Sequence, residues 1–332
     1  MSAAIMIFIT FIIILLQRFI YMKFGLTGVT YECYFGSPAA IEGEEVEFIE
    51  KIANRKLLPI PWLRKESMFP GSLKFVTTSE LAVSAGELYQ NHRSMFSLMS
   101  YTQIIRTHKV LCAKRGWYTV DSANLTCGDL VDAAVRRKEE KFTQQILVYP
   151  KPLSVDELSF ASRSWQGNLT VRRWILADPF SLSGVKEYQY GDPLNLIHWK
   201  ATARTGRLQV HNQDYTANPK LMICLNFEVS ESMWKAVSDP QLIEYGIRYA
   251  VTIAQYALNQ GLEVGFSCNG YVWRDPHKSP IWVAPAGGEG QLYTLNETMA
   301  KLEIAVSQPF DVFLQQDELQ PNGQMDFVII TP

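Results

Sequence analysis

The first 24 residues, MSAAIMIFITFIIILLQRFIYMKF, contain no charged side chain before Arg18. With Gln17 and Arg18 reaching towards the head groups, the apolar segment extends over about 20 residues, which is the length that a helix needs to cross a bilayer. A secretory signal peptide would carry a basic start and a small-residue cleavage site, and the segment has neither. We therefore expect residues 1–24 to form a single uncleaved transmembrane anchor.

Two weak signals indicate the side of the membrane on which the rest of the chain lies. Arg18 and Lys23 flank the C-terminal end of the apolar segment, and no basic residue precedes it. The positive-inside rule then places the following residues in the cytoplasm. The five cysteines form no CxxC pair and are odd in number, which fits a reducing compartment, where most should be small buried hydrophobes. They are Cys33, Cys112, Cys127, Cys224 and Cys268.

The composition is that of a globular protein with more than one domain. The chain has 332 residues, of which 47% are hydrophobic and 19% charged. This length is sufficient for two or three domains with cores of their own. The formal net charge of −2 provides no overall field towards nucleic acid, so we expect no nucleic-acid partner.

Residues 30–150 alternate polar and apolar side chains in short segments separated by turns. GEEVEFIEKIANRK predicts a strand that ends at Asn54, and the prolines of KLLPIPWLRKES suit an edge strand. Residues 102–113 and 116–120 predict two strands joined by a tight turn, and VRRKEEKF is typical of a solvated segment. A β-sandwich of immunoglobulin-like type is the expected domain.

The pattern changes after residue 150. Residues 151–218 are irregular and form a connecting region, with residues 162–184 expected to be a flexible insert. In residues 219–332, KLMICLNF predicts a buried strand, and a helix should follow from a Ser238–Gln241 capping box to Gly261. Another strand, a second helix over about 290–304 and the strand MDFVIITP complete an α/β domain, which ends early for its kind. We expect parallel pairing in this unit.

The segment VKEYQYGDPLNLIHWKATARTGRLQV contains the most distinctive motif. It resembles the signature of a bacterial family known as domain of unknown function 58. The resemblance is carried by Tyr188, Gly191, Asp192, His198, Trp199, Lys200, Arg204 and Gly206. IEGEEVEFIEKIANRKLLPIPWL, KRGWYTV and LTCGDLV also resemble the β-rich part of the family. The chain departs from the pattern at Lys186 and Asn195, where arginine is usual, and at Tyr190, where proline is usual.

The resemblance implies a fold and a type of partner. It implies a membrane-attached protein with a β-rich domain followed by a Rossmann-like domain of the von Willebrand factor A type. It also implies association with a MoxR-type AAA ATPase and with other cell-envelope proteins, in a chaperone or assembly role. Where lysine and asparagine replace the two arginines, bidentate contacts to an anion are lost, so an anion-binding role is weakened.

The residues of the signature also have an interpretation of their own. Asp192 should cap a short helix that starts at Pro193 and ends at Gly206, with Lys200 and Arg204 on one face. This describes a structural joint between the two halves of the chain. The alternative is a hydrolase in which Asp192 orients His198 as a base.

A second alternative is a divalent-metal site after the strand KLMICLNF. Glu228, Ser230 and Ser232 match the spacing of the Asp–x–Ser–x–Ser loop that binds Mg²⁺ in von Willebrand factor A domains. Glutamate in place of aspartate moves the ligand oxygen by about 1.5 Å, which disturbs the strict octahedral geometry that Mg²⁺ requires. We therefore expect no cofactor, with Mg²⁺ as the alternative, and a non-enzymatic, membrane-anchored adaptor as the favoured function.

Overall fold

A computed structural model of the chain describes residues 2–76, 82–85, 89–129, 135–154, 182–189, 197–213, 220–228, 237–315 and 325–332. The first element is the helix α1 (Ser2–Phe24). Residues Ile5–Phe24 have a mean hydropathy of 2.3, which is apolar enough and long enough for a membrane span by length and composition. The predicted apolar helix is therefore present, and its side chains are largely exposed.

The strands that follow form a β-sandwich, so the predicted sandwich is confirmed. One sheet has the order β1-β3-β8-β5, and the other has the order β2-β10-β9-β4-β7-β6. Their bounds are β1 (Val29–Phe35), β2 (Ala39–Ile41), β3 (Glu45–Asn54), β4 (Ile60–Pro70), β5 (Leu73–Phe75), β6 (Ala82–Ala85), β7 (Tyr89–Leu98), β8 (Gln103–Cys112), β9 (Gly116–Gly128) and β10 (Val135–Tyr149). Neighbouring strands are antiparallel except β2 and β10, which are parallel.

The alternation of the sequence determines which side chains enter the sandwich. In β3 every second residue is buried, beginning with Val46 and Phe48. Phe48 packs edge-on against Phe69 of the opposite sheet, with ring centroids 5.1 Å apart. Apolar residues from both sheets form one continuous core. Because a strand presents alternate residues to opposite faces, a shift by one residue would expose this whole set.

One strand prediction in the sandwich was wrong. β4, expected at an edge, lies between β9 and β7 in the interior of its sheet. Pro59 precedes the strand, and Pro61 falls where the pairing with β7 shifts register, just before pairing with β9 begins at Trp62. The prolines therefore remove no ladder hydrogen bond that the central strand needs. The two strands expected over residues 102–113 and 116–120 are present as β8 and β9, joined by a short turn, and β9 extends further, to Gly128. They lie in opposite sheets, and the turn at Lys114–Arg115 crosses between the sheets.

The charged run VRRKEEKF also has a structure that its composition did not predict. It is the first half of β10, and it pairs with β9 from Val135 to Lys141. Its side chains are mostly exposed, so the expectation of solvation holds for them. The backbone is nevertheless ordered by the ladder, since the β9 strand supplies partners for its N–H and C=O groups.

The C-terminal part is an α/β unit. Its main sheet has the order β16-β14-β13-β18, with β13 parallel to both β14 and β18, and β16 antiparallel to β14. The predicted parallel pairing is thus confirmed. The bounds are β13 (Lys220–Leu225), α4 (Pro240–Asn259), β14 (Glu263–Cys268), β15 (Gly270–Val272), β16 (Ile281–Ala286), α5 (Glu289–Lys301), β17 (Leu302–Val306), α6 (Phe310–Leu314) and β18 (Met325–Ile330).

Helices cover both faces of this sheet. Ile223 and Leu225 of β13 belong to a core with α4 and α5, while Met222 and Cys224 pack on the other face with Phe313 of α6. The cap of α4 is Asp239 rather than the predicted Ser238, because the Asp239 carboxylate accepts hydrogen bonds from the backbone N–H groups of the first turn. All five cysteines are free and buried, whereas the sequence predicted burial for most of them.

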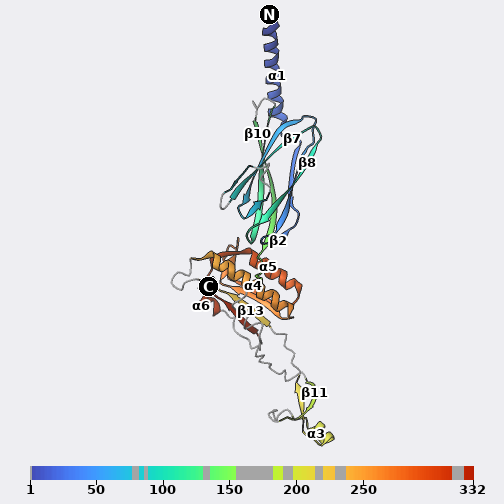
Figure 1. The fold of residues 1–332 in the computed structure, drawn as a ribbon, viewed down its shortest axis with the longest axis vertical. Coiled ribbons are helices and arrows are strands. Elements are labelled where there is room, and N and C mark those ends of the chain that lie inside the picture. The colour runs from blue at the N-terminus through green and yellow to red at the C-terminus, as the bar shows by residue number, and fades with distance from the viewer. Residues whose placement is uncertain are drawn as a thin grey trace.

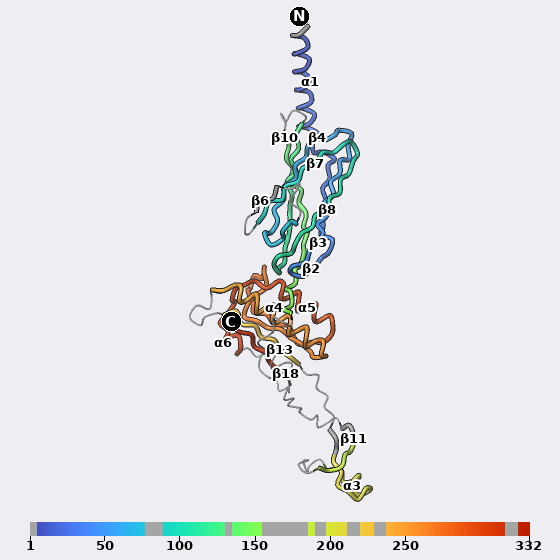
Figure 2. The backbone as a smooth tube through the Cα atoms, viewed as in Figure 1, coloured from blue at the N-terminus to red at the C-terminus, as the bar shows by residue number. Residues whose placement is uncertain are grey.

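The units follow one another along the long axis of the molecule. α1 extends from one end of the sandwich, and the α/β unit lies at the other end (Figure 1). The long strands of the sandwich run between these two ends (Figure 2). A small unit of β11 (Leu182–Glu187), β12 (Gln209–Gln213) and the helix α3 (Trp199–Thr205) lies beyond the α/β unit. Of the expected flexible insert, residues 162–181 lie outside the described residues.

Candidate functional site

The signature residues that the structure describes are brought together in the small β11–β12–α3 unit. β11 and β12 are antiparallel, and the backbone N–H of Tyr188 donates to the carbonyl of Leu208 at 2.9 Å. Tyr188, His198, Trp199, Lys200, Arg204 and Gly206 all belong to this unit. Gly191 and Asp192 lie outside the described residues, so the predicted pairing of Asp192 with His198 or with the cations stays a prediction.

His198 has a structural task in this unit. It is the N-cap of α3, and its Nδ1 accepts a hydrogen bond of 3.1 Å from the backbone N–H of Ala201. α3 therefore begins at Trp199, whereas the sequence predicted a start at Pro193. A neutral imidazole has one acceptor nitrogen, so Nε2 carries the proton while Nδ1 caps the helix. This arrangement does not favour His198 as a general base.

The remaining signature residues form the surface of α3. Gly206 has φ = 71° and is the left-handed C-cap that the sequence predicts. Trp199 is 70% exposed, which is unusual for so large an aromatic side chain, and Lys200 and Arg204 are exposed on the same helix. The nearby Arg207 pairs with Glu187 at 3.1 Å, and both are exposed. Such an exposed surface can contact a partner.

The predicted metal ligand Glu228 lies at the carboxyl edge of the parallel sheet, where ligands of α/β proteins commonly bind. Its Oε2 accepts a hydrogen bond of 2.9 Å from the backbone N–H of Phe310, at the start of α6. One oxygen of the Glu228 carboxylate is thus used to hold the start of α6. This use does not favour Glu228 as a metal ligand. Ser230 and Ser232 are outside the described residues, so Mg²⁺ binding stays a prediction.

Two asparagines join the strand ends at this edge. Asn269, which is fully buried, accepts a hydrogen bond from the backbone N–H of Phe227 at 2.8 Å. Its amide donates to Asn226 and to the carbonyl of Gln308, both at 3.3 Å. Asn226 in turn donates to the hydroxyl of Thr331 after β18 at 3.3 Å. The edge is therefore occupied by a neutral hydrogen-bond network that fixes β13, β14 and β18 to one another.

An open apolar groove of about 770 Å³ lies between α4 and β18, next to this network. Tyr245 and Tyr256 of α4 are 43% and 46% exposed, and Ile329 of β18 is 52% exposed. β18 has one neighbouring strand, β13, among the described strands of the sheet. The described lining contains no charged side chain. A groove of this size with a few polar groups is suited to binding an apolar surface.

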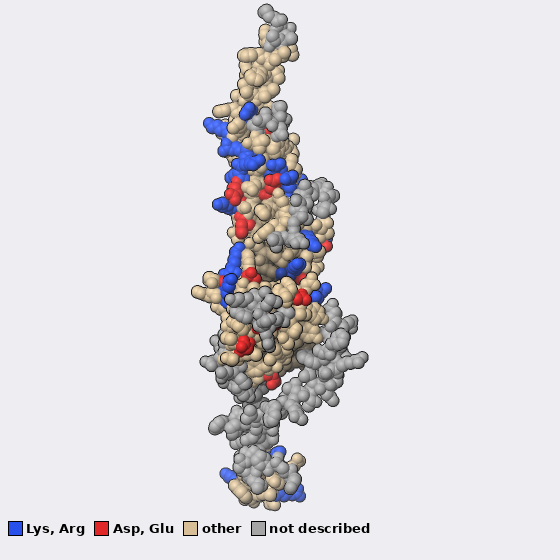
Figure 3. Space-filling model, turned by 90° about the vertical axis from the view of Figure 1, so that its left-hand side faces the viewer, with Lys and Arg blue, Asp and Glu red and all other residues tan. Residues whose placement is uncertain are grey.

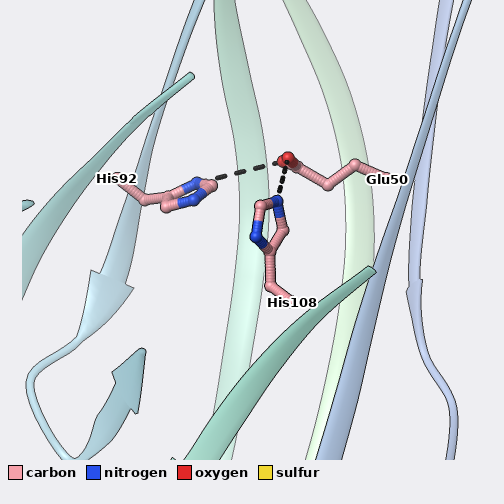
Figure 4. A group of neighbouring side chains, drawn as sticks. All are labelled: Glu50, His92 and His108. Carbon is pink, nitrogen blue, oxygen red and sulfur yellow. Dashed lines mark hydrogen bonds and ion pairs between the residues drawn. The ribbon is translucent and has the colours of Figure 1, made fainter. Parts of the chain in front are cut away.

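The most unusual site lies inside the sandwich, where five ionisable side chains meet. Figure 4 shows three of them, Glu50, His92 and His108. The Glu50 carboxylate accepts hydrogen bonds from the Tyr31 hydroxyl at 2.8 Å and from His108 Nε2 at 3.0 Å. The Lys65 ammonium forms an ion pair with Glu50 and lies 2.9 Å from His92 Nδ1. The side chains of Glu50, Lys65 and His92 are fully buried. We call these residues, with Tyr31 and His108, the buried charge cluster.

Electrostatics accounts for the protonation states in the cluster. Burial alone would raise the pKa of Glu50, but Lys65, His108 and His92 together hold it well below its usual range. Burial lowers the pKa of His92 to about 3, with Lys65 as the next cause. His92 is therefore neutral, and its ring stacks on Phe75 with centroids 4.3 Å apart. Burial also lowers the pKa of Lys65, an effect that the Glu50 carboxylate opposes.

The cluster does not fit a metal ion. Among the described residues, Glu50, His92 and His108 form the one group of three His, Cys, Asp or Glu side chains whose ligand atoms lie within 4.8 Å of one another. The Lys65 ammonium, however, contacts both Glu50 and His92, and the rings of Tyr31, Phe48 and Phe69 lie within 5.8 Å of it. A second cation there would face this ammonium at contact distance. The cluster is an internal ion pair whose cation is Lys65.

Sequence reasoning missed the cluster, although a signal was present. Glu50 lies in phase with Val46, Phe48 and Ile52, the inward-facing residues of β3. Lys65 and His92 likewise lie in phase with the buried residues of β4 and β7. A charged residue at an inward position of an alternating strand indicates a buried partner. Such a search over several strands at once would have suggested this site.

The sandwich and the α/β unit are joined by Arg115, from the turn between β8 and β9. Its Nε donates to Glu244 of α4 at 2.6 Å, and its Nη1 donates to the carbonyls of Met299 and Leu302 at 2.8 and 3.0 Å. The Arg115 side chain is only 3% exposed. Trp117 packs edge-on against Trp273, with centroids 6.0 Å apart. The junction is thus built from specific, buried contacts.

No protein-family model matches the chain, and none of the curated proteins compared with it matches either. Several solved β-domains resemble part of it. A non-cellulosomal cohesin from Archaeoglobus fulgidus has 9% identity and a TM-score of 0.24, covering 39% of this chain and 96% of that domain. A cohesin module of a family 33 glycoside hydrolase from Clostridium perfringens has 8% identity and a TM-score of 0.26, covering 37% and 97%. A human ASH/PapD-like domain has 14% identity and a TM-score of 0.24, covering 37% and 87%. At these values the similarities carry no inference about ligand, partner or activity.

Proposed function

We propose that this chain is a membrane-anchored, non-enzymatic adaptor that presents its α/β unit to a protein partner. In this proposal α1 is a single-pass anchor in the cell membrane, and the folded units lie in the cytoplasm. The sandwich is of immunoglobulin-like type, and the α/β unit is of von Willebrand factor A type. The partner is a MoxR-type AAA ATPase that acts with it in the maturation of envelope or protein complexes.

The observation that carries this proposal is the Arg115 junction. A guanidinium that is buried and bonded to one carboxylate and to backbone carbonyls fixes the relative orientation of two units more firmly than an exposed linker would. The segment that follows β10 also connects the two units, because the backbone N–H of Leu153 donates to the Thr252 hydroxyl of α4 at 2.9 Å. A protein that holds a binding unit at a set distance from a membrane needs a rigid spacer of this kind.

The connection continues to α1. The Tyr21 hydroxyl donates to the carbonyl of Pro59 in the sandwich at 3.1 Å, and Lys56 donates to the carbonyl of Phe24, the last residue of the helix, and to that of Gly25 just after it. A cation at this position also interacts favourably with the negative end of the helix dipole. The groove of the α/β unit is thereby held at a fixed distance from the helix that serves as the anchor. The groove itself, with its exposed tyrosines, is the surface to which the proposal assigns the partner.

Site-specific photo-crosslinking in the native cell tests the proposal. A photoreactive residue at Tyr245 in the groove should give an adduct that mass spectrometry identifies as the MoxR-type ATPase. The matched control is the same residue at Met95, which is 50% exposed on the sandwich. An adduct with the ATPase at both positions, or at neither position, would contradict the assignment of the partner to the groove. Membrane attachment is tested separately by carbonate extraction, where release into the supernatant would contradict the anchor.

A further inference from the structure

The end of the sandwich next to α1 combines features that sequence order separates. We call it the membrane-proximal face and define it by residues 18–28, 54–60, 98–103 and 135–137. Hydrogen bonds hold these segments together. The backbone N–H of Arg55 donates to the carbonyl of Gly28 at 2.8 Å, the N–H of Tyr101 donates to the carbonyl of Lys56 at 3.2 Å, and Arg136 donates to the carbonyl of Met22.

Large apolar side chains project from this face. Leu57 is 75% exposed, Met99 69% and Tyr101 70%, although each belongs to a turn of a folded sandwich. Tyr101 has φ = 54°, a left-handed conformation that is uncommon outside glycine. Val135, at the start of β10, is 50% exposed. Isolated exposed apolar residues are ordinary, but a group of them at one end of a domain indicates an interaction surface.

The same face is positively charged. Its residues include the six cations Arg18, Lys23, Arg55, Lys56, Arg136 and Arg137. The nearby acidic side chain of Asp129, next to Tyr21, is buried. Figure 3 shows Lys and Arg gathered where α1 meets the sandwich. The whole chain has a formal net charge of −2, so this local excess is not a property of the composition. Cations around apolar tips match a surface of anionic head groups over a hydrocarbon layer.

The length of α1 determines where this face lies relative to a bilayer. Residues Ile5–Phe24 are sufficient to cross the hydrocarbon core, since 20 residues of helix extend about 30 Å. Tyr21, near the end of that segment, is only 6% exposed because it packs on the sandwich. No flexible linker therefore separates the helix from the face, and a spanning α1 brings the turns to the level of the head groups.

We propose that the membrane-proximal face binds the anionic phospholipid surface directly. Leu57, Met99 and Tyr101 enter the boundary between head groups and acyl chains, and Arg55, Arg136 and Arg137 contact lipid phosphates. The inference depends on the proposed membrane anchor and goes beyond it, because it assigns lipid contacts to the sandwich. Its consequence is an upright molecule whose α/β unit has a fixed height above the membrane.

Depth-dependent quenching on the full chain in lipid nanodiscs tests the apolar part. The native cysteines are all buried, so a Leu57→Cys variant can be labelled selectively with an environment-sensitive fluorophore. We expect brominated lipid to quench this label several-fold more than a label at Met68→Cys. Met68 is 65% exposed, but it lies eight residues along β4 from Ile60, about 26 Å from the face. Equal quenching at the two positions would overturn the inference.

Lipid charge tests the cationic part. Brominated phosphatidylglycerol should quench the Leu57→Cys label more than brominated phosphatidylcholine does, and Arg55→Glu with Arg137→Glu should abolish the difference. Lys74→Glu, which reverses an exposed cation of β5, should leave it unchanged. No preference for phosphatidylglycerol in the unaltered face would overturn the assignment to anionic lipid. If carbonate extraction releases the wild-type chain from the membrane, both the anchor and the inference are overturned. If the chain stays in the membrane but brominated lipid does not quench the Leu57→Cys label, the inference alone is overturned.

Discussion

His92 links the buried charge cluster to the stability of the sandwich in acid. The unfolded chain binds a proton at this imidazole near its ordinary pKa of 6.5, whereas in the folded chain the pKa is about 3. Between these values the unfolded state holds more protons, so the free energy of unfolding falls as the pH falls. We expect a loss of about 1.4 kcal/mol for each pH unit below 6.5 from this residue.

Urea unfolding at a series of pH values measures this effect, and His92→Phe serves as the comparison. Phenylalanine retains the stacking on Phe75 but has no proton to bind. The variant should be less stable at neutral pH, since Lys65 loses an acceptor, and its stability should depend less on pH between 6.5 and 5. The carboxylates contribute mainly below that window, including Glu50, whose depressed pKa adds stability that is lost only as the pH falls below the ordinary carboxyl value. An unchanged slope would show that His92 is not the titrating group.

Glu50 and Lys65 provide a second prediction at the scale of single residues. Glu50→Gln leaves the Lys65 ammonium buried with no counter-ion, and removing one partner of a buried pair destabilises a protein by about 3–5 kcal/mol. Glu50→Gln combined with Lys65→Met removes both charges, and we expect it to recover a large part of that loss. Thermal denaturation of the single and double variants measures the coupling. If the double variant is as unstable as the sum of the single variants, the pair is not the source of the stability.

Individual elements were predicted with different success, for physical reasons that can be stated. α1 and α4 depend on patterns within one segment, and both helices were identified from the sequence. The edge position predicted for β4 was wrong because a proline disfavours a central strand only where its missing N–H would have donated a ladder hydrogen bond. The pairing of β4 with β7 and β9 leaves the prolines at positions where no such bond is needed, and this pairing cannot be read from β4 alone. The start of α3 was wrong because the His198 imidazole acts as a cap, which is uncommon for histidine. The buried charge cluster draws on five strands from two sheets. The inward positions of Glu50, Lys65 and His92 can be read within single strands, but no local pattern shows that they meet.

Asn269 provides a prediction at the scale of elements. It follows β14 and bonds the residue after β13, so it connects two parallel strands at their carboxyl ends. Asn269→Ala leaves buried polar groups without partners, each of which costs about 1–3 kcal/mol. Hydrogen exchange should therefore become faster in β13 and β14. Asn259→Ala, in an exposed position at the end of α4, is the control and should have little effect. Protection that is unchanged in Asn269→Ala would mean that the helices alone hold the strand ends.

At the scale of the whole molecule, the adaptor depends on whether the sandwich and the α/β unit move together. The Arg115 guanidinium meets the C-terminal end of α5, where the carbonyls of Met299 and Ala300 have no helical partner. A cation there is favoured by the helix dipole as well as by its hydrogen bonds. Glu244, its ion-pair partner, is partly exposed, so water weakens that contribution and the carbonyl bonds carry most of the effect.

Arg115→Ala should therefore uncouple the two units while leaving each of them folded. We expect faster hydrogen exchange in the last turn of α5 and in β17, and a thermal transition that separates into two steps, because three carbonyls and one carboxylate lose their donor at once. Arg115→Lys should give an intermediate result, since an ammonium retains the charge but not the planar fork that reaches several acceptors. Lys114→Ala, at the exposed neighbouring position, should behave as the wild type. A single transition and unchanged exchange in Arg115→Ala would show that apolar contacts such as Trp117 with Trp273 hold the units together, and that the fixed geometry does not depend on the guanidinium.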